Sequence, residues 1–459
     1  MSQDLKVLGK IELILSELSR GLSRPEQKFL RDLVFGILCS QSSLLSKIAR
    51  AIADPEEVKV VYDRLDINLG RYDLSRPYQR AQSEILKRVD ETFLFIFDPS
   101  EIVKPFALKM EGLSLVRDAS DKPKKVKTAN GKFVNVQPLK PGYPLRVAIA
   151  MSPVGDILPV ELSLYSYASE FFISQNDETL QALETLIHKT NFLPTLILDR
   201  EFDSYSVIRH LGQLRQQFVI RLKKNRKYRI PGEPRKNKGD TYTREEMANK
   251  YAFLSSNEFI TYSKKGKVKT HLFEFRAAYV ELLSEQKGAD TIRDIGDIQA
   301  LTLIQVRIKK ETGTPVLYLL TNSRPKSPED LSRVARSYLA RWNVEEYIRF
   351  IKQHFSIEDF LVRDLGRMKN LIWATYIATV IIHLLTDRRS NFGFKNHHHL
   401  LMQSLPVSSP KKSRDFFLYS YGAGLSNIVS LNKKLLAPAQ VGANSSEKDP
   451  QLKFQIGLT

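Results

Sequence analysis

The 459-residue sequence is poor in cysteine and tryptophan: it has one cysteine, Cys39, and two tryptophans, Trp342 and Trp373. A single cysteine excludes a disulfide framework or a cysteine-based zinc site within one chain, and this usage is typical of a reducing cytosol. The N-terminal stretch MSQDLKVLGK lacks the uncharged apolar run of a secretory signal. We therefore expect a cytoplasmic protein.

Long hydrophobic runs are also lacking. The most apolar stretch, Leu371–Leu385, has 15 residues and contains Thr375, Thr379 and His383. A membrane-spanning helix needs about 20 apolar residues, so this stretch predicts a buried core helix rather than a membrane span.

Acidic residues are in the minority. The chain has 70 Lys and Arg against 51 Asp and Glu, a formal net charge of +19. Such an excess attracts polyanions, with nucleic acid the first candidate and an acidic membrane surface the second. The hydrophobic content of 42% is enough for a large core, and a chain of this length predicts about two or three domains.

Residues 1–90 show a helical pattern. Arg24–Cys39 has apolar residues at helical spacing, 40–42 predicts a turn, and Ser43–Ala53 predicts a second helix whose outer face carries Lys47 and Arg50. A helix, a short polar turn and a short basic helix form a helix-turn-helix pattern, which ordinary helical bundles also match. We predict a helical DNA-binding domain here, with Lys47 and Arg50 as DNA contacts.

Beyond residue 90 the pattern changes. Thr92–Phe97 is rich in aromatic residues and predicts a buried strand that ends at Asp98, and Pro194–Leu198 predicts another that ends at Asp199. Further strands are expected at 145–151, 157–164 and 217–222, helices at 177–189 and 202–214, and an exposed lysine-rich loop at 122–132. Strands followed by alternating helix and strand indicate a mixed α/β sheet over 91–222.

The later part of the chain divides into a β-rich region, a helical region and a polar tail. Several β-rich runs at 223–322 predict a mainly β insertion, after which 323–390 returns to the core. The tail at 391–459 is rich in Ser, Pro, Asn and Lys, with a short helix expected near 425–436. The run His397–His399 lies in this tail and is expected in an exposed loop, because consecutive histidines rarely share one metal.

One long helix is predicted at Ser327–Phe355, with Ser327 suited to the N-cap. At about 100° per residue, Tyr338, Arg341, Glu345 and Lys352 fall in one stripe about 60° wide. An apolar stripe beside it comprises Val344, Ile348, Ile351 and Phe355. The polar stripe suits a grip on a phosphodiester next to a metal-binding acid, although a solvated face with weak ion pairs has the same pattern.

Asp98 and Asp199 each follow an apolar strand. If those strands are parallel neighbours, both carboxylates emerge at the sheet edge where ligand sites of open α/β sheets lie. Glu345 on a helix over the sheet would complete a cluster of three acids, which Mg²⁺ or Mn²⁺ would neutralise through the hard oxygen ligands that these ions prefer. The alternative is that both aspartates are turn residues at strand ends.

The spacing Tyr-x2-Arg-x3-Glu-x6-Lys, met by Tyr338, Arg341, Glu345 and Lys352, resembles the signature of DDE transposases of the insertion sequence 4 family. The stretches FLFIFDPSEIVKP and LILDREFD are similar to the first-aspartate and second-aspartate strands of that family. The resemblance covers roughly residues 90–390.

The resemblance implies an α/β fold: an RNase H-like mixed-sheet core with a mainly β insertion and a helical N-terminal DNA-binding domain. Asp98, Asp199 and Glu345 would be the catalytic residues and would bind two Mg²⁺ ions, with Mn²⁺ able to substitute. The DNA contacts would come from Tyr338, Arg341, Lys352, Lys223, Lys224 and Arg226 in addition to the N-terminal domain.

The activity that the resemblance implies is cut-and-paste transposition. Water would cut double-stranded DNA at the terminal inverted repeats, and the freed 3′-OH would be joined to target DNA, in relatives by way of a hairpin. The expected partner is a second copy of the chain, which would form a homodimer in the synaptic complex, with 391–459 a candidate dimerisation region. The resemblance implies a cytoplasmic protein of the bacterial type that is nucleoid-associated when bound to DNA. Neither a membrane nor a small-molecule cofactor is expected to take part.

One departure from the family pattern concerns the hairpin step. Relatives can use a tryptophan of the insertion to hold a flipped base, and both tryptophans here lie outside 223–322, so a Tyr or Phe takes this part or the step differs. Two other functions remain: a metal-dependent nuclease without strand transfer, and a catalytically silent DNA-binding relative. Asp118, Asp121 and Asp203 remain as alternative ligands.

Overall fold

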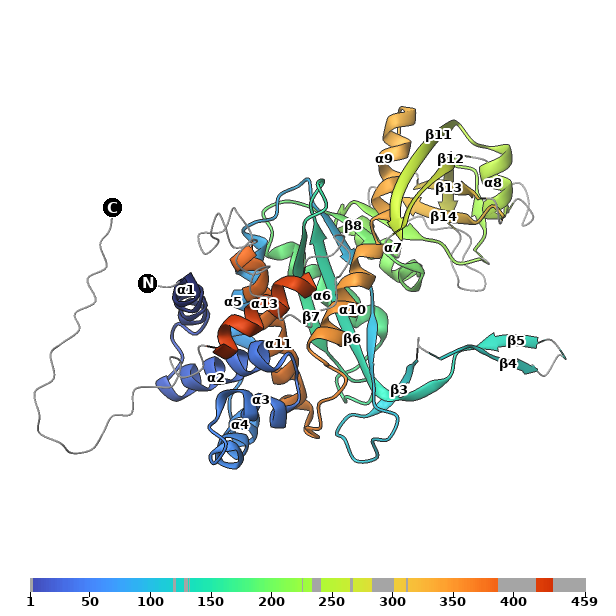
Figure 1. Ribbon diagram of the computed structural model, residues 1–459. Coiled ribbons are helices and arrows are strands. Elements are labelled where there is room, and N and C mark those ends of the chain that lie inside the picture. Colours follow the sequence, from blue (N-terminus) through green and yellow to red (C-terminus); the bar gives the residue numbers. More distant parts are fainter. Residues whose placement is uncertain are drawn as a thin grey trace, which may run out of the picture.

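The computed structural model describes residues 3–118, 121–127, 131, 133–224, 226–232, 241–264, 267–282, 301–310, 313–386 and 418–431. The fold is mixed α/β, with a large mixed sheet, helices packed on it and a helical N-terminal region (Figure 1). The run His397–His399 and most of the predicted tail region lie outside the described residues.

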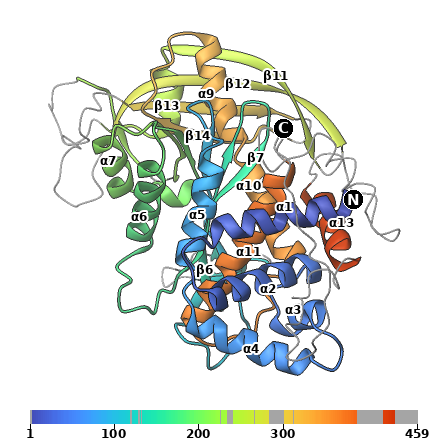
Figure 2. The same ribbon diagram turned by 90° about the vertical axis from the view of Figure 1, so that its left-hand side faces the viewer.

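The N-terminal region is helical, as predicted. Its helices are α1 (Gln3–Leu18), α2 (Arg24–Ser40), α3 (Leu45–Ile52), α4 (Val58–Arg71) and α5 (Ser75–Leu86). Ser23 and Glu26 form a capping box that starts α2, and Gln41 in the left-handed region (φ 49°) ends it. Helices α1, α2, α4 and α5 contact α11 (Leu365–Thr386), which lies among them in Figure 2.

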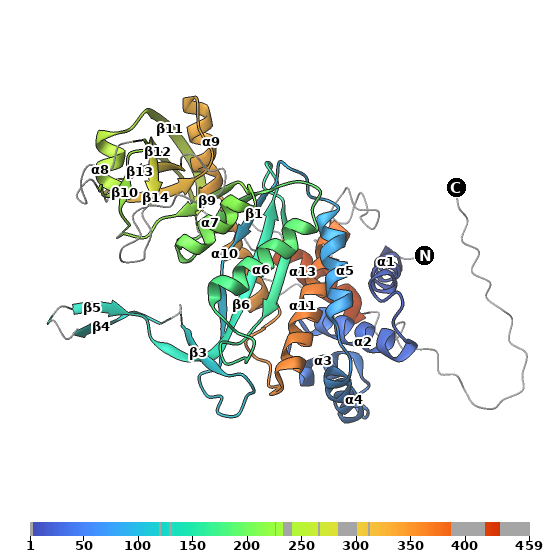
Figure 3. The same cartoon turned by 180° about the vertical axis from the view of Figure 1, so that it is seen from behind.

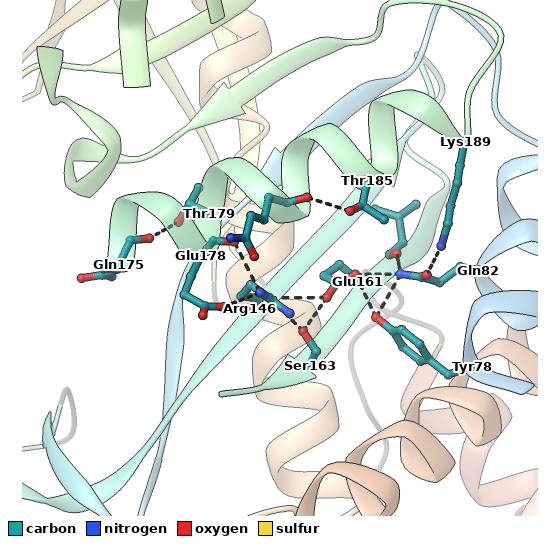
Figure 4. Close-up of polar contacts among 12 residues, drawn as sticks. Tyr78, Gln82, Arg146, Glu161, Ser163, Gln175, Glu178, Thr179, Thr185 and Lys189 are labelled. Atoms are coloured by element: carbon teal, nitrogen blue, oxygen red, sulfur yellow. Dashed lines mark hydrogen bonds and ion pairs between the residues drawn. The ribbon is translucent and has the colours of Figure 1, made fainter. Parts of the chain in front are cut away.

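A buried polar network attaches α5 to the sheet (Figure 4). The carboxylate of Glu161 accepts hydrogen bonds from the hydroxyl of Tyr78 at 2.8 Å and from Nε2 of Gln82 at 2.7 Å. Arg146 forms an ion pair with Glu161 at 3.7 Å and with Glu178 at 2.6 Å. The N-terminal helices are therefore fastened to the sheet by charge and hydrogen bonds as well as by apolar packing.

The sheet has β1 (Leu94–Phe97) near its centre. The other strands of this part are β2 (Ser100–Val103), β3 (Ser114–Arg117), β6 (Leu139–Met151), β7 (Ile157–Leu164), β8 (Thr195–Leu198) and β9 (Phe218–Arg221). The order β7-β6-β1-β8-β9 has β1, β8 and β9 parallel and β6 antiparallel to both β1 and β7. The five strands of this order lie at the predicted places, together with the helices α6 (Gln175–His188) and α7 (Tyr205–Gln213), whereas β2 and β3 were not predicted.

The β-rich region at 223–322 extends the same sheet. It contains β10 (Tyr228–Arg229), α8 (Arg244–Lys250), β11 (Leu254–Lys264), β12 (Lys267–Leu282), β13 (Leu301–Lys309) and β14 (Val316–Thr321). Strand β14 pairs with β9 in the register Leu320↔Ile220. The insertion is thus joined to the core by a continuous hydrogen-bonded ladder.

The prediction of a loop at 122–132 was wrong for part of that range. β4 (Lys124–Lys127) and β5 (Phe133–Val136) form an antiparallel pair, with Val126 opposite Val134. The hairpin projects from the body on the side opposite α1 (Figure 3). The lysines hid the β signal, because the β-branched and aromatic residues that favour pairing are spread between them.

The prediction of one helix at Ser327–Phe355 was also wrong, since two helices occupy this range. They are α9 (Pro328–Leu339) and α10 (Trp342–His354), with Ser327 capping α9 as predicted. At the junction, the amide of Arg341 bonds to the carbonyl of Tyr338 and that of Val344 to Arg341. These i→i−3 bonds tighten the chain into a 3₁₀-type turn, which ends one helix and starts the next.

Helix α11 forms the centre of the packing, and it contains the stretch predicted as a core helix. It is long and apolar enough to span a membrane, with a mean hydropathy of 1.4, but 89% of its most apolar window is buried inside the protein. Tyr376 on this helix donates to the carbonyl of Pro159 on β7 at 3.0 Å. The predicted C-terminal helix corresponds to α13 (Leu418–Leu431), whose Ser426 donates to the carbonyl of Cys39 in α2.

Candidate active site

Asp98 and Asp199 emerge side by side at one edge of the sheet. Strands β1 and β8 are parallel neighbours with Phe97 opposite Leu198. The next residue of each chain segment is an aspartate, so both carboxylates leave the sheet at the carboxyl ends of adjacent parallel strands. The condition on which the predicted site depended is therefore met.

Arg341, at the junction of α9 and α10, contacts all three predicted acids. Its Nη1 lies 2.7 Å from Oδ2 of Asp98, and its Nη2 lies 2.6 Å from Oε1 of Glu345. Its Nε is 3.8 Å from Oδ1 of Asp199. Because one guanidinium touches three carboxylates, the acids from β1, β8 and α10 meet around a single point.

Asp199 has two further partners. The hydroxyl of Tyr338 donates a hydrogen bond of 3.0 Å to its Oδ1, and Nη1 of Arg221 lies 4.0 Å from the same oxygen. Burial raises the pKa of Tyr338, and the charge of Asp199 raises it further, so the phenol stays protonated and acts as a donor. Tyr338 therefore orients the Asp199 carboxylate.

The site is buried on one side and open on the other. The side chain of Asp98 is 13% exposed and that of Glu345 is 48% exposed. Burial raises the pKa of Asp98 to about 7, although the charge of Arg341 opposes this shift and those of Asp199 and Glu345 add to it. The pKa of Arg341 is raised above its ordinary value because its acidic neighbours outweigh the effect of burial.

Lys352, the fourth residue of the predicted stripe, lies apart from the three acids. It follows Glu345 by seven positions, about 10 Å along the helix. Its Nζ donates to the carbonyl of Glu101 at 2.6 Å and to Oε1 of Glu358 at 3.1 Å. Lys352 thus borders the site at β2 rather than touching the acids.

The other predicted DNA contacts differ in accessibility. Lys223 and Lys224 are exposed just after β9, and Lys47 and Arg50 are exposed on α3. The side chain of Arg226 is buried, being 5% exposed, and forms an ion pair of 2.7 Å with Asp203. The guanidinium of Arg226 is therefore paired with Asp203 inside the protein and is not on the surface where DNA would bind.

The alternative acids are engaged in structural pairs. Asp118 and Asp121 both pair with Lys140, at 2.7 and 3.0 Å, and Asp203 is fully buried against Arg226. None of these three residues contacts Arg341 in the part of the chain that the structure describes.

Two residues at this edge were missed from the sequence. Arg221 is the last residue of β9, the strand next to β8, and the apolar run that ends there was a readable sign of a third strand end at the same edge. Glu201 follows Asp199 by two positions and pairs with Arg117 at 2.7 Å. Arg117 reaches Glu201 because β3 pairs with β6, and no local sequence pattern indicates this pairing.

The donor chemistry of the site suits a hard divalent cation, since all three acids offer carboxylate oxygens. Their arrangement does not yet form a metal cage: among the described residues, no group of three or more Asp, Glu, His and Cys side chains is placed to share an ion. The positive charge that the three carboxylates share is that of Arg341.

Comparison with known proteins gives one family match. Residues 163–381 match the family model of the transposase DDE domain, and the match contains Asp199, Arg341 and Glu345. No curated protein matches the chain significantly. A solved structure, the piggyBac transposase synaptic complex with hairpin DNA, is similar at 11% identity and a TM-score of 0.33, over 95% of this chain and 73% of that chain. The family match supports a transposase DDE domain over residues 163–381.

Proposed function

We propose that this protein is a cut-and-paste DNA transposase of the insertion sequence 4 type. It would cleave DNA at terminal inverted repeats by two-metal phosphoryl transfer and join the freed 3′-OH to target DNA. The observation that carries the proposal is the meeting of Asp98, Asp199 and Glu345 around Arg341 within a mixed sheet. The order β7-β6-β1-β8-β9, with β1, β8 and β9 parallel, is compatible with an RNase H-like core.

In this proposal the three acids would hold two Mg²⁺ ions, which supply Lewis-acid stabilisation of the attacking and leaving oxygens when bound. Three neighbouring carboxylates repel one another unless cations compensate them, and here Arg341 does so. For the acids to become ligands, the Arg341 guanidinium has to turn away from them. Its long side chain would then be free to hold a DNA phosphate as a bidentate donor.

The chain's own residues have distinct parts in this scheme. Tyr338 keeps Asp199 oriented through its hydrogen bond. Lys352 would contact a phosphate further along the DNA, because it lies about two helical turns from Glu345. Lys223 and Lys224 would contact the DNA backbone, whereas Arg226 is assigned a structural part on account of its buried pair.

DNA end recognition is assigned to the N-terminal helices, with Lys47 and Arg50 on the exposed face of α3. A homodimer would bridge two ends in the cytoplasm. A hairpin intermediate belongs to the proposal, with an aromatic residue other than tryptophan holding the flipped base, because Trp342 and Trp373 lie in α10 and α11.

The experiment compares Glu345→Gln with Glu346→Gln. Glu346 is the adjacent residue of α10 and pairs with Arg349 instead of Arg341, so it controls for loss of a carboxylate on this helix. With Mg²⁺ and a duplex carrying the DNA that flanks the gene, E345Q should lose cleavage and keep DNA binding, while E346Q should cleave like the wild type. Cleavage by E345Q at the wild-type rate would refute the assignment.

A strand-transfer assay distinguishes the proposal from a simple nuclease. Duplexes with pre-cut 3′-OH ends are incubated with a supercoiled plasmid as target. Joined products support transposition. Cleavage of uncut ends without any joining of pre-cut ends would instead favour the nuclease, and end binding without either reaction would favour the silent relative.

A further inference from the structure

The hairpin of β4 and β5 is a highly exposed, lysine-rich surface. All residues of β4 are exposed, as are Phe133 (70%) and Val136 (45%) on β5. Residues 122–136 contain five lysines and no acidic residue. Of these lysines, the described Lys122, Lys124, Lys125 and Lys127 are all exposed. We refer to residues 122–136 as the lysine arm.

The lysine arm has a fixed base. Nζ of Lys140 lies 2.7 Å from Oδ2 of Asp118 and 3.0 Å from Oδ2 of Asp121. Nε2 of Gln137 donates to the carbonyl of Asp121 at 2.7 Å. These contacts clamp the two chain segments where the arm leaves β3 and β6, so the direction of the arm is set by the body of the protein.

The base of the arm lies beside the candidate active site. Arg117, the last residue of β3, pairs with Glu201 at 2.7 Å. Glu201 follows Asp199 by two positions, so this ion pair links the end of β3 to the segment that carries Asp199. A DNA strand held at the three acids would therefore pass close to the base of the arm.

We propose that the lysine arm grips duplex DNA next to the scissile phosphodiester. A two-stranded β-ribbon has the width that the major groove of B-DNA admits, and lysines on it reach phosphates without reading sequence. An isolated two-stranded hairpin is marginally stable in water, and contact with DNA would stabilise it. This proposal rests on the proposed function, because it assigns a further contact to the same substrate.

A second copy of this chain is the competing occupant of the arm. The exposed Val126, Phe133 and Val136 would suit such a contact, but two arms brought together would place like charges against each other. A polyanion removes that repulsion and accounts for the absence of acidic residues over the whole arm. DNA is therefore the occupant that the charges favour.

The test uses the full chain with two arm variants. One is K124E/K125E, and the other replaces residues 122–136 by a short Gly-Ser linker, which is feasible because Asp121 and Gln137 are hydrogen-bonded neighbours. The control R209E/K250E makes the same charge change at exposed positions of α7 and α8, to which the proposed function assigns no DNA contact. Binding to a generic 40-base-pair duplex and to the gene-flanking duplex is measured from about 50 to 200 mM salt.

Both arm variants should bind either duplex on the order of tenfold more weakly. The plot of log affinity against log salt should be flatter by about 0.9 for each phosphate that the variant no longer neutralises. R209E/K250E should keep the wild-type slope. Equal slopes in wild type and arm variants overturn the proposal. An altered oligomeric state with unchanged DNA binding also overturns it, in favour of an interface between copies.

The outcomes for the arm are separable from those for the active site. Loss of cleavage by E345Q together with unaltered DNA binding by the arm variants would support the proposed function and refute the proposal that the lysine arm binds DNA. Weakened DNA binding by the arm variants, in a protein whose wild type cleaves no DNA, would support DNA binding by the lysine arm and count against the transposase function.

Discussion

Nη1 of Arg341 lies 2.7 Å from Oδ2 of Asp98, although 243 positions separate the two residues. The same guanidinium reaches Glu345 at 2.6 Å and Asp199 at 3.8 Å. One cation thus compensates three carboxylates that would otherwise repel one another at the end of the sheet. Together with the hydrogen bond from Tyr338 to Asp199, Arg341 therefore links the α9–α10 junction to the ends of β1 and β8.

Replacing Arg341 by Ala should destabilise the protein by about 3 kcal/mol, because breaking a buried ion pair leaves an uncompensated charge. The side chains of Arg341 and Asp98 are only 8% and 13% exposed. Chemical unfolding in urea with EDTA measures the effect. The matched control is Arg349→Ala, whose pair with Glu346 is on the surface and should contribute less than about 1 kcal/mol. An equal loss of unfolding free energy in the two variants would contradict the view that Arg341 compensates the charge of the three carboxylates.

Much of the core could be predicted from the sequence because its signals are local. The runs before Asp98 and Asp199 are short, apolar and bounded by turn residues, so both strands and their end positions were readable. The parallel pairing of these strands was a condition that only the structure could test. The cap at Ser327 and the burial of Val344 and Ile351 also follow from helical periodicity.

What the sequence did not show depends on tertiary contacts. Helical spacing continues through Ala340 and Arg341, so the turn between α9 and α10 is invisible in the pattern. The arm was predicted as a loop because its lysines masked a weak β signal. Arg226 resembled a surface cation, and its burial follows from Asp203, a partner 23 positions away that no local pattern identifies.

Tyr338→Phe should slow DNA cleavage about 10- to 100-fold and leave DNA affinity unchanged within error. The hydroxyl donates to Asp199 at 3.0 Å, and a hydrogen bond to a charged group contributes about 1.5–3 kcal/mol. Single-turnover cleavage at saturating protein measures the rate. Tyr347→Phe is the control, because Tyr347 is fully buried in α10 on the core side. A wild-type rate for Y338F would show that Asp199 needs no orienting donor.

Tyr78→Phe should lower the free energy of unfolding by about 2 kcal/mol, since the buried Glu161 carboxylate loses a donor at 2.8 Å. The network of Figure 4 joins α5 to β7, so limited proteolysis should also cut the N-terminal region faster in this variant. Tyr205→Phe, a partly exposed position on α7, serves as control. Unchanged stability and proteolysis in Y78F would mean that apolar packing alone holds α5 on the sheet.

Lys104 should make stability rise with pH in the alkaline range. Burial lowers the pKa of Lys104 from 10.5 to about 8, although Asp359 and Glu358 oppose the shift. Its Nζ donates to the carbonyl of Phe360 at 2.6 Å and to that of Glu358. Between pH 8 and 10.5 the unfolded chain binds the proton that the folded chain has released, so the free energy of unfolding increases with pH. Well below pH 8 both states carry the charge, and the contribution is constant.

The measurement compares wild type with Lys104→Met by urea unfolding at about pH 6, 7, 8, 9 and 10, which brackets the shifted pKa of Lys104. Groups that titrate alike in the two proteins cancel, so the difference isolates Lys104. Wild type should gain stability relative to K104M steadily above pH 8 and show no relative change at the two most acidic points. A difference that is flat across the whole range would mean that the ammonium is as well solvated in the folded protein as in the unfolded chain. A falling one would mean that the two carbonyls and the Phe360 ring, 3.8 Å from Nζ, stabilise the cation beyond the cost of its burial.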